Sequence, residues 1–180
     1  MAYASEAGMP LIADPGFELS RKVAEAGLPQ TCVPGPSAVL TALCVGGLPT
    51  DAFHFAGFLP NAAAARLSAL EALREVPGTL VFYESPKRLG AMLKDAARAL
   101  GAQRQAATCR ELTKKFEEIT RGTLGELADR FSEKAPKGEI VVLVDRARSS
   151  SVSVSDLSQD LREALEQLSM RDAVDLVARA

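Results

Sequence analysis

The sequence is poor in the residues that cross-link small proteins or bind metals. It has three cysteines (Cys32, Cys44 and Cys109) and one histidine, His54, in 180 residues. Three widely spaced cysteines exclude a disulfide framework and a zinc ribbon, so we expect no metal site. The cysteines are expected to be small core residues. His54, inside the alternating stretch FHFAGF, is expected to be a structural histidine.

The sequence also lacks long hydrophobic runs and a strong excess of either charge. No apolar run approaches the roughly 20 residues of a membrane span, and no basic-then-apolar signal pattern is present at the N-terminus. Hydrophobic residues make up 47% of the chain and charged residues 24%, as in soluble globular proteins. We therefore expect a reduced, cytoplasmic protein with no membrane partner.

The net charge of −2 argues against indiscriminate nucleic-acid binding, but the charge is unevenly distributed. Between Pro86 and Lys115, eight basic residues stand against two acidic ones, which leaves a local excess of +6. One interpretation is a solvated helix face followed by a loop. The other is a surface that contacts phosphates.

The first 46 residues contain two expected strand-to-helix turns. Short strands are expected at Ala2–Ser5 and Thr31–Val33, and helices after Asp14-Pro15 and over Ser37–Val45. An N-cap aspartate followed by proline is the preferred order at a helix start. This strand–helix–strand–helix order predicts a parallel sheet with helices packed on its faces.

A second unit of mixed α/β structure is expected from Leu48-Pro49-Thr50 onward. TLVFY is expected to be a central strand, and Thr123 and Glu126 have the spacing of a capping box. SSSVSVS is typical of a linker, and two short helices follow it. The expected strands are Phe53–Gly57, Thr79–Tyr83, Ala106–Arg110, Glu117–Thr120 and Glu139–Val144, and the expected helices are Ala62–Glu75, Pro86–Leu100 and Thr123–Phe131.

Six strings between residues 2 and 145 resemble, in order and spacing, the tetrapyrrole-methylase-like superfamily. They are GMPLIADPG, VPGPSAVLTAL, LPTDAFHFAGFLP, GTLVFYESPKRL, CRELTKKFEEITRGTLGEL and KGEIVVLV. Within the superfamily they are most similar to the bacterial small-subunit ribosomal RNA methyltransferase I (RsmI) family. The YESP and REL strings favour this branch over the porphyrin enzymes.

The resemblance implies 2′-O-methylation of a cytidine ribose in 16S rRNA by S-adenosyl-L-methionine, with the 30S subunit as partner. It also implies a homodimer of two-domain subunits, each holding the cofactor in the cleft between its α/β domains. Residues 1–48 are then the remainder of a Rossmann-like, parallel-sheet N-terminal domain, and 49–146 a C-terminal α/β domain with a mixed sheet. Residues 147–155 are the linker and 156–180 a partial helical appendage.

The chain departs from the family pattern in two places. The family's first strand and its GTPIGNL-type loop have no counterpart, and the final helices stop partway. The expectation is therefore a chain truncated at both ends, and an inactive one if cofactor binding needs the missing loop. After GFLP the family carries basic residues, whereas here only Arg66 keeps a charge.

The resemblance places the cofactor at the two N-terminal turns. Gly8 allows close backbone approach, and the helix starting near Pro15 offers free N–H groups to a carboxylate. An ordinary βα turn or helix cap is the alternative at both turns. The residues assigned to the cofactor are Ala7, Gly8, Met9, Pro10, Asp14, Pro15, Gly16, Pro36, Ser37 and Ala38.

Charged residues in the second unit are the candidates for catalysis and RNA binding. Methyl transfer needs mainly alignment of the ribose oxygen with the methyl group, so no single base is nominated. A structural ion pair is the alternative for the charged residues between Arg110 and Glu118, and solvated charge at a helix N-terminus is the alternative for Lys87 and Arg88. The catalytic candidates are Glu84, Arg110, Glu111, Lys114 and Glu118, and the RNA-binding candidates are Arg66, Lys87, Arg88, Lys114 and Lys115.

Two other functions remain open at this stage. One is a methylase of the same fold that acts on a tetrapyrrole or another small molecule, which would require a large apolar cleft without a basic rim. The other is a fragment that folds and dimerises but binds no cofactor.

Overall fold

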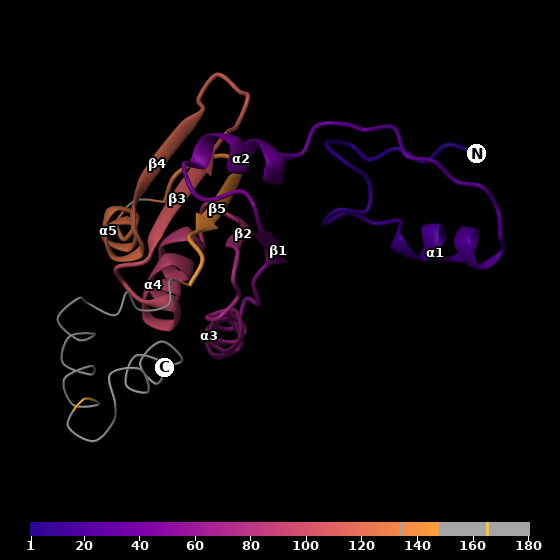
Figure 1. The fold of residues 1–180 in the computed structure, drawn as a ribbon. Coiled ribbons are helices and arrows are strands. Elements are labelled where there is room, and N and C mark those ends of the chain that lie inside the picture. The colour runs from indigo at the N-terminus through magenta and orange to yellow at the C-terminus, as the bar shows by residue number, and fades with distance from the viewer. Residues whose placement is uncertain (134, 148–164, 166–180) are drawn as a thin grey trace. The chain divides into compact units, whose positions relative to one another are not determined.

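The computed structural model describes residues 1–133, 135–147 and 165, and Met1–Ala147 form one compact unit. The predicted linker and helical appendage, except for Ala147 and Leu165, lie outside the described residues. The elements (Figure 1) are α1 (Phe17–Glu25), α2 (Ala38–Gly46), β1 (Phe53–Phe58), α3 (Ala63–Ala72), β2 (Thr79–Glu84), α4 (Leu89–Leu100), β3 (Gln105–Arg110), β4 (Glu118–Thr123), α5 (Leu124–Arg130) and β5 (Ile140–Val144).

The strands form one mixed sheet in the order β1-β2-β5-β3-β4. β1 is parallel to β2, and the other neighbouring pairs are antiparallel. The predicted mixed α/β architecture of this half is therefore confirmed. TLVFY forms an internal strand, as expected, while the middle position belongs to β5, whose five residues are all buried. An apolar strand of this kind requires cover on both faces.

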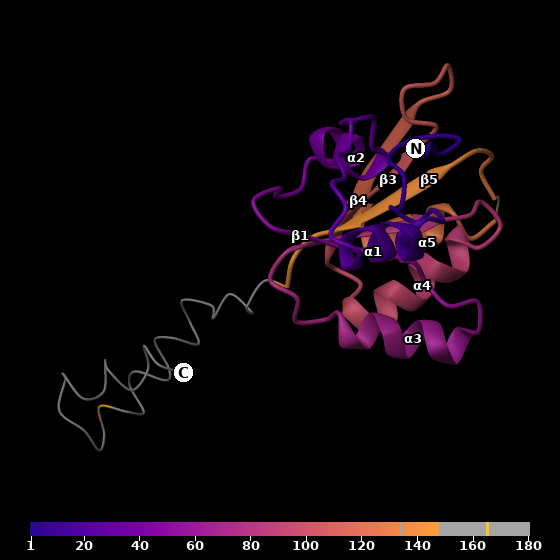
Figure 2. The same ribbon diagram turned by 90° about the vertical axis from the view of Figure 1, so that its right-hand side faces the viewer.

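Helices cover both faces of the sheet. α4 and α5 lie on one face with α3 packed against α4, and α2 lies on the other face (Figures 1 and 2). Because side chains alternate along a strand, Phe82 and Val142 face α4 and α5, whereas Val81 and Leu143 face α2. The predicted apolar stripe of α4 is confirmed, since Leu89, Met92, Leu93 and Ala96 are at most 1% exposed.

The predicted capping box at the start of α5 is confirmed. The Thr123 hydroxyl accepts a hydrogen bond from the Glu126 N–H at 3.2 Å, and the Glu126 carboxylate accepts one from the Thr123 N–H at 2.7 Å. The bond from the Thr123 N–H, followed by the contact with the Thr123 side chain, holds the pKa of the Glu126 carboxyl below its ordinary value. Two donors that a helix start leaves without partners are thereby satisfied.

The prediction of a parallel sheet in the first 46 residues is wrong for this structure. Residues 2–5 and 31–33 form no strand, and α1 is capped by Gly16 rather than by Asp14. No residue between 1 and 36 is buried. A strand needs a neighbouring strand to receive its hydrogen bonds. Residues 2–5 and 31–33 have no such neighbour in this structure, so only the helices α1 and α2 form in this part of the chain.

The expectation that the cysteines are core residues needs correction. Cys109 is buried, but Cys32 and Cys44 are exposed. Cys44 lies on α2, which packs on the sheet through Val39, Ala42 and Leu43 on a different face. His54 is exposed on the edge strand β1, and its structural role stays a prediction.

Candidate functional site

The sheet brings the five catalytic candidates to one of its ends. In the register of neighbouring strands, Glu84 lies opposite Ile140, Ile140 opposite Arg110, and Arg110 opposite Glu118. Glu111 and Lys114 lie in the β3–β4 loop that connects two of these strands. The end of β2, the end of β3 and the start of β4 therefore form one polar edge.

Within the β3–β4 loop, Glu111 is held by hydrogen bonds and an ion pair. Its Oε1 accepts a hydrogen bond from the Glu139 N–H at 2.9 Å and one from Lys114 Nζ at 3.1 Å. The first contact, and then the second, lower the pKa of Glu111. Lys114 Nζ also lies 3.0 Å from Glu139 Oε2, and both carboxylates raise the Lys114 pKa. A carboxylate stabilised in its ionised form is a weak proton acceptor at neutral pH.

Arg110 and Glu118 form an ion pair across β3 and β4. Arg110 donates from Nε at 3.1 Å and from Nη2 at 2.9 Å to the same oxygen of Glu118, and its Nη1 donates to the Lys137 carbonyl at 3.1 Å. Arg130 of α5 lies 3.4 Å from the other Glu118 oxygen. These charges neutralise one another. Arg110 and Glu118 thus form the structural ion pair that the sequence offers as the alternative to a catalytic role.

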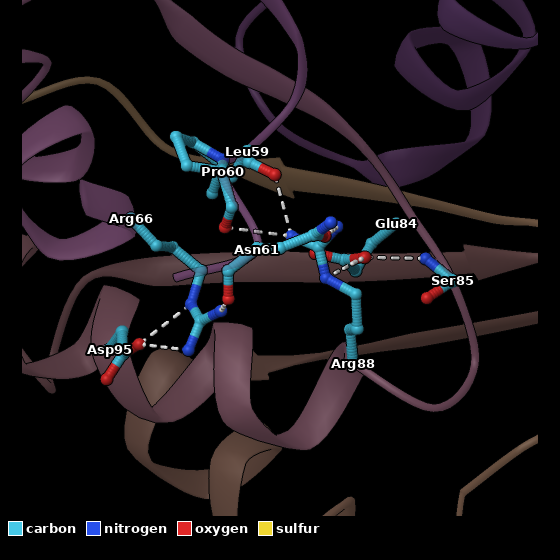
Figure 3. Close-up of polar contacts among 8 residues, drawn as sticks. All are labelled: Leu59, Pro60, Asn61, Arg66, Glu84, Ser85, Arg88 and Asp95. Atoms are coloured by element: carbon cyan, nitrogen blue, oxygen red, sulfur yellow. Dashed lines mark hydrogen bonds and ion pairs between the residues drawn. The ribbon is translucent and has the colours of Figure 1, made fainter. Parts of the chain in front are cut away.

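Glu84 is buried at the end of β2 (Figure 3). Its side chain is 1% exposed, and its Oε1 accepts a hydrogen bond from the Ser85 N–H at 2.7 Å and lies 3.4 Å from Arg88 Nε. Arg88 in turn donates to the carbonyl oxygens of Leu59 at 2.7 Å and Pro60 at 3.1 Å. In this arrangement Glu84 orients Arg88, and Arg88 holds the segment that follows β1.

Arg66 secures the same segment from the other side. It is 6% exposed and forms a two-pronged ion pair with Asp95 of α4, from Nε at 2.8 Å and Nη2 at 2.7 Å. Its Nη1 donates to the Asn61 carbonyl at 3.1 Å, while Arg88 Nη1 donates to the Asn61 side-chain oxygen at 2.5 Å (Figure 3). Both arginines therefore have internal partners.

The remaining RNA-binding candidates, Lys87 and Lys115, are exposed. Lys87 lines a groove of about 510 Å³ between α4 and the segment after α5. Lys94 lines this groove too, but so do Asp129 and Glu133. Charges of both signs do not favour a polyanion there.

The two turns assigned to the cofactor lie against each other. Gly8 has φ +72°, and a Cβ on it would lie 3.6 Å from the Pro36 carbonyl oxygen. Next to it, the Gly35 N–H points at the Met9 sulfur at 3.0 Å. The two turns, which contact each other through residues 26 positions apart in the sequence, are thus close enough in space to share a ligand site.

The residues around these turns have structural contacts of their own. Ser37 is the N-cap of α2, and its Oγ accepts a hydrogen bond from the Leu40 N–H at 3.4 Å, as in the helix-cap alternative. Tyr3 Oη donates to the Pro15 carbonyl at 2.8 Å. The pKa of Tyr83 on β2 is raised, first by burial and then by the charges of Asp14 and Glu139.

Sequence reasoning missed Phe116 at the polar edge. Its ring is 64% exposed, and Lys115 Nζ lies 5.6 Å from the ring centroid. The signal available in the sequence was an aromatic residue in a charged turn, where no apolar periodicity requires one.

None of the helices described is long and apolar enough to span a membrane. No group of three or more His, Cys, Asp or Glu residues is placed to hold a metal ion within the described ranges.

Comparison with known proteins identifies the family. The sequence profile of the family described as Tetrapyrrole (Corrin/Porphyrin) Methylases matches residues 1–128. The chain belongs to the tetrapyrrole methylase family. This match confirms the superfamily expected from the six sequence strings.

Within the family, the similar curated relatives carry the name Ribosomal RNA small subunit methyltransferase I. The relative from Mesorhizobium japonicum is 45% identical over 180 residues, which cover 99% of this chain and 61% of the relative. One from Mycobacterium tuberculosis is 46% identical over 176 residues, with 98% and 61% covered. The expected resemblance to this branch is confirmed, and the chain spans about three fifths of these relatives' length.

Solved structures of the family share the fold. Cobalt precorrin-4 methyltransferase, a cobalamin biosynthetic enzyme, matches with a TM-score of 0.55 and 17% identity over 77% of this chain and 61% of that one. Uroporphyrin-III C-methyltransferase from Thermus thermophilus, complexed with S-adenosylhomocysteine, matches with a TM-score of 0.51 and 21% identity over 76% and 62%.

Proposed function

We propose that the chain is part of a methyltransferase that uses S-adenosyl-L-methionine to methylate the 2′-oxygen of a cytidine ribose in 16S rRNA. The observation that carries the proposal is 45% identity, over 99% of the chain, to a ribosomal RNA small subunit methyltransferase I. The 30S subunit is the proposed substrate and the cytoplasm the proposed compartment.

The cofactor site is proposed at the two N-terminal turns. Their contacts at Gly8–Pro36 and Met9–Gly35 support this placement. The N-terminal N–H groups of α1, which follows Gly16, are suited to hold the methionine carboxylate of the cofactor. In this proposal residues 1–48 belong to a Rossmann-like cofactor domain and residues 49–146 form the second α/β domain.

Catalysis is proposed to rest on alignment rather than on a strong base. The sulfonium is a good leaving group, and orientation alone contributes about 7–11 kcal/mol to such reactions. Glu111 and Glu118 are ion-paired, which suits them to shaping the polar edge. Glu84, Arg66 and Arg88 would act through the segment 59–61 that they hold.

RNA binding is proposed at the exposed lysines of residues 49–146: Lys115 meets a phosphate, and Lys87, whose groove also holds Asp129 and Glu133, is the weaker candidate. Arg110 and Lys114 lie at the same polar edge and would add positive charge there while keeping their carboxylate partners. A homodimer is part of the proposal because the resemblance implies one.

The test combines cofactor binding and methyl transfer. Calorimetry measures S-adenosyl-L-methionine binding by this chain. A chimera, in which this chain replaces the matching 61% of the Mesorhizobium japonicum relative, is then incubated with unmethylated 30S subunits and radiolabelled cofactor. Label in one ribose of 16S rRNA supports the proposal. A folded chimera that binds cofactor and leaves the subunits unlabelled contradicts the rRNA substrate, with the unaltered relative as control.

A tetrapyrrole methylase is the second candidate, favoured by the shared fold of the corrin and porphyrin enzymes. Methyl transfer by the same chimera to uroporphyrinogen III, and not to 30S subunits, would establish it. Failure of both the chain and the chimera to bind the cofactor would favour a non-catalytic, dimerising fragment.

A further inference from the structure

The tip of the β3–β4 loop carries an exposed aromatic ring. Phe116 is 64% exposed in a turn of charged residues. An exposed ring is expensive in water and contributes nothing to the core, which lies in the two clusters on either face of the sheet. Phe116 is therefore available to a partner outside the described unit.

The loop is held rigidly behind this ring. Lys114 bridges Glu111 and Glu139, and the Thr113 N–H donates to the Glu117 carboxylate at 2.6 Å. Glu111 and Thr113 adopt positive φ angles of 49° and 64°, which non-glycine residues rarely do. Backbone strain of this kind persists where surrounding contacts enforce it, and it is concentrated at binding sites. The tip is thus preorganised, which lowers the entropy lost on binding.

The charge next to the ring indicates the chemistry of the partner. No carboxylate among the described residues pairs with Lys115, whose Nζ lies 5.6 Å from the Phe116 ring centroid. An exposed ring beside a lysine without a carboxylate partner is how proteins hold single-stranded nucleic acid: the base stacks on the ring, and the phosphate meets the lysine in place of its present contact with the ring.

We propose that Phe116 stacks on an unpaired base of the RNA substrate while Lys115 contacts the adjoining phosphate. The proposal rests on the proposed function and specifies how its polar edge holds RNA. A protein surface would also accept an exposed ring, but Lys115, which has no carboxylate partner among the described residues, favours a phosphate.

The sequence contains no tryptophan, so Phe116→Trp introduces a single indole fluorophore at the tip. The 180-residue chain carrying this substitution is titrated with a single-stranded RNA octamer and with its duplex form. We expect saturable quenching by the single strand and weaker quenching by the duplex. Phe53→Trp is the matched control, because Phe53 is 45% exposed at the start of β1, at the opposite end of the sheet, and the emission of this variant should not change.

Affinity for the same octamer, measured by anisotropy, separates stacking from simple apolar contact. Phe116→Leu keeps the apolarity and loses the ring, and we expect an affinity about 5- to 150-fold lower. Lys115→Gln should weaken binding and reduce the salt slope by about 0.7. Circular dichroism and the thermal midpoint establish that each variant is folded.

Three results would overturn the proposal. They are wild-type affinity in Phe116→Leu, unquenched emission of the Phe116→Trp variant while the octamer is bound, and failure of the wild-type chain to bind the octamer. If the emission of Phe116→Trp shifts with protein concentration in the absence of RNA, the ring belongs to a protein contact instead. Methylation of 30S subunits by the chimera tests the proposed function separately, so either proposal can fail alone.

Discussion

Several arginines connect distant segments of this fold by donating hydrogen bonds to main-chain carbonyl oxygens. Arg88 binds Leu59 and Pro60, Arg104 binds Asp145 at 2.5 Å, and Arg121 binds Gly46 at 3.0 Å at the end of α2. The planar, permanently charged guanidinium suits this role because it can donate to several acceptors at once. The basic stretch from Pro86 to Lys115 is therefore in part internal structure, and its exposed lysines are what remains for a polyanion.

We predict that Arg88→Ala destabilises the fold by about 3 kcal/mol. The substitution frees three acceptors of the segment 59–61 and leaves the carboxylate of Glu84, whose side chain is 1% exposed, without its cation. Urea unfolding measures the loss. Lys87→Ala, at the adjacent exposed position, is the control and should change stability little. Equal effects of the two substitutions would contradict the conclusion that Arg88 holds the segment 59–61.

The contacts of Glu111 predict that the free energy of unfolding decreases at acidic pH. The folded-state pKa of Glu111 lies below its ordinary value of 4.5, so its contribution is fully present above about pH 4.5 and is lost as the pH falls through the lowered value. Glu111→Gln should be less stable than the wild type at pH 7, and the difference should shrink toward pH 3. Urea unfolding across this range measures it. A difference that does not vary with pH would exclude ionisation as its cause.

Some helices and strands are determined by residues close to one another in the sequence, and others by the elements packed against them. α5 begins where its capping box predicts, because the cap and the third helical residue contact each other within one turn. β5 is buried along its whole length because it lies between β2 and β3. α2 is positioned by Val39, Ala42 and Leu43 against the sheet.

We predict that Thr123→Ala costs about 1 kcal/mol, because it removes the side-chain oxygen that accepts from the Glu126 N–H. Urea or thermal unfolding measures the loss. Ser68→Ala is a suitable control, since Ser68 is exposed in the middle of α3 and caps nothing, and alanine has the higher helix propensity. It should be neutral or slightly stabilising. Destabilisation of the same size in Ser68→Ala would contradict a specific capping effect.

At the scale of the whole molecule, the cysteines report on global unfolding. Cys32 and Cys44 are exposed. Cys109 is fully buried between β4 and β5, and burial raises its pKa to about 11. The thiolate is the reactive form of cysteine. Cys109 is therefore protected from thiol reagents in two ways: a reagent cannot reach it, and its raised pKa keeps it protonated.

We predict that a thiol reagent such as DTNB, at about pH 8, modifies two thiols quickly and the third only as the protein unfolds. Absorbance at the product wavelength gives both phases. A variant with Cys32→Ser and Cys44→Ser should show the slow phase alone, and urea should accelerate it. Rapid modification of that variant would mean that β3 opens without global unfolding.

Much of the fold follows from patterns within the sequence. The stripe of α4, the cap of α5 and the apolar strands β2 and β5 were all predictable, since each depends on residues within a few positions of one another. The strands expected at 2–5 and 31–33 were not correct, because a strand depends on a neighbour that no local pattern can provide. Cys32 and Cys44 were expected in the core and are exposed, because residue type alone does not indicate which side of a segment the fold covers.

The sequence by itself determined the family and the positions of most elements in the second unit, because its motifs and periodicities are local and retain their order. Only the tertiary structure decided that Glu84, Arg110, Glu111, Lys114 and Glu118 share one end of the sheet. It also decided that Arg66 and Arg88 turn inward and that Phe116 points outward. The partners of a charged side chain depend on strand order and register, which join residues far apart in the chain.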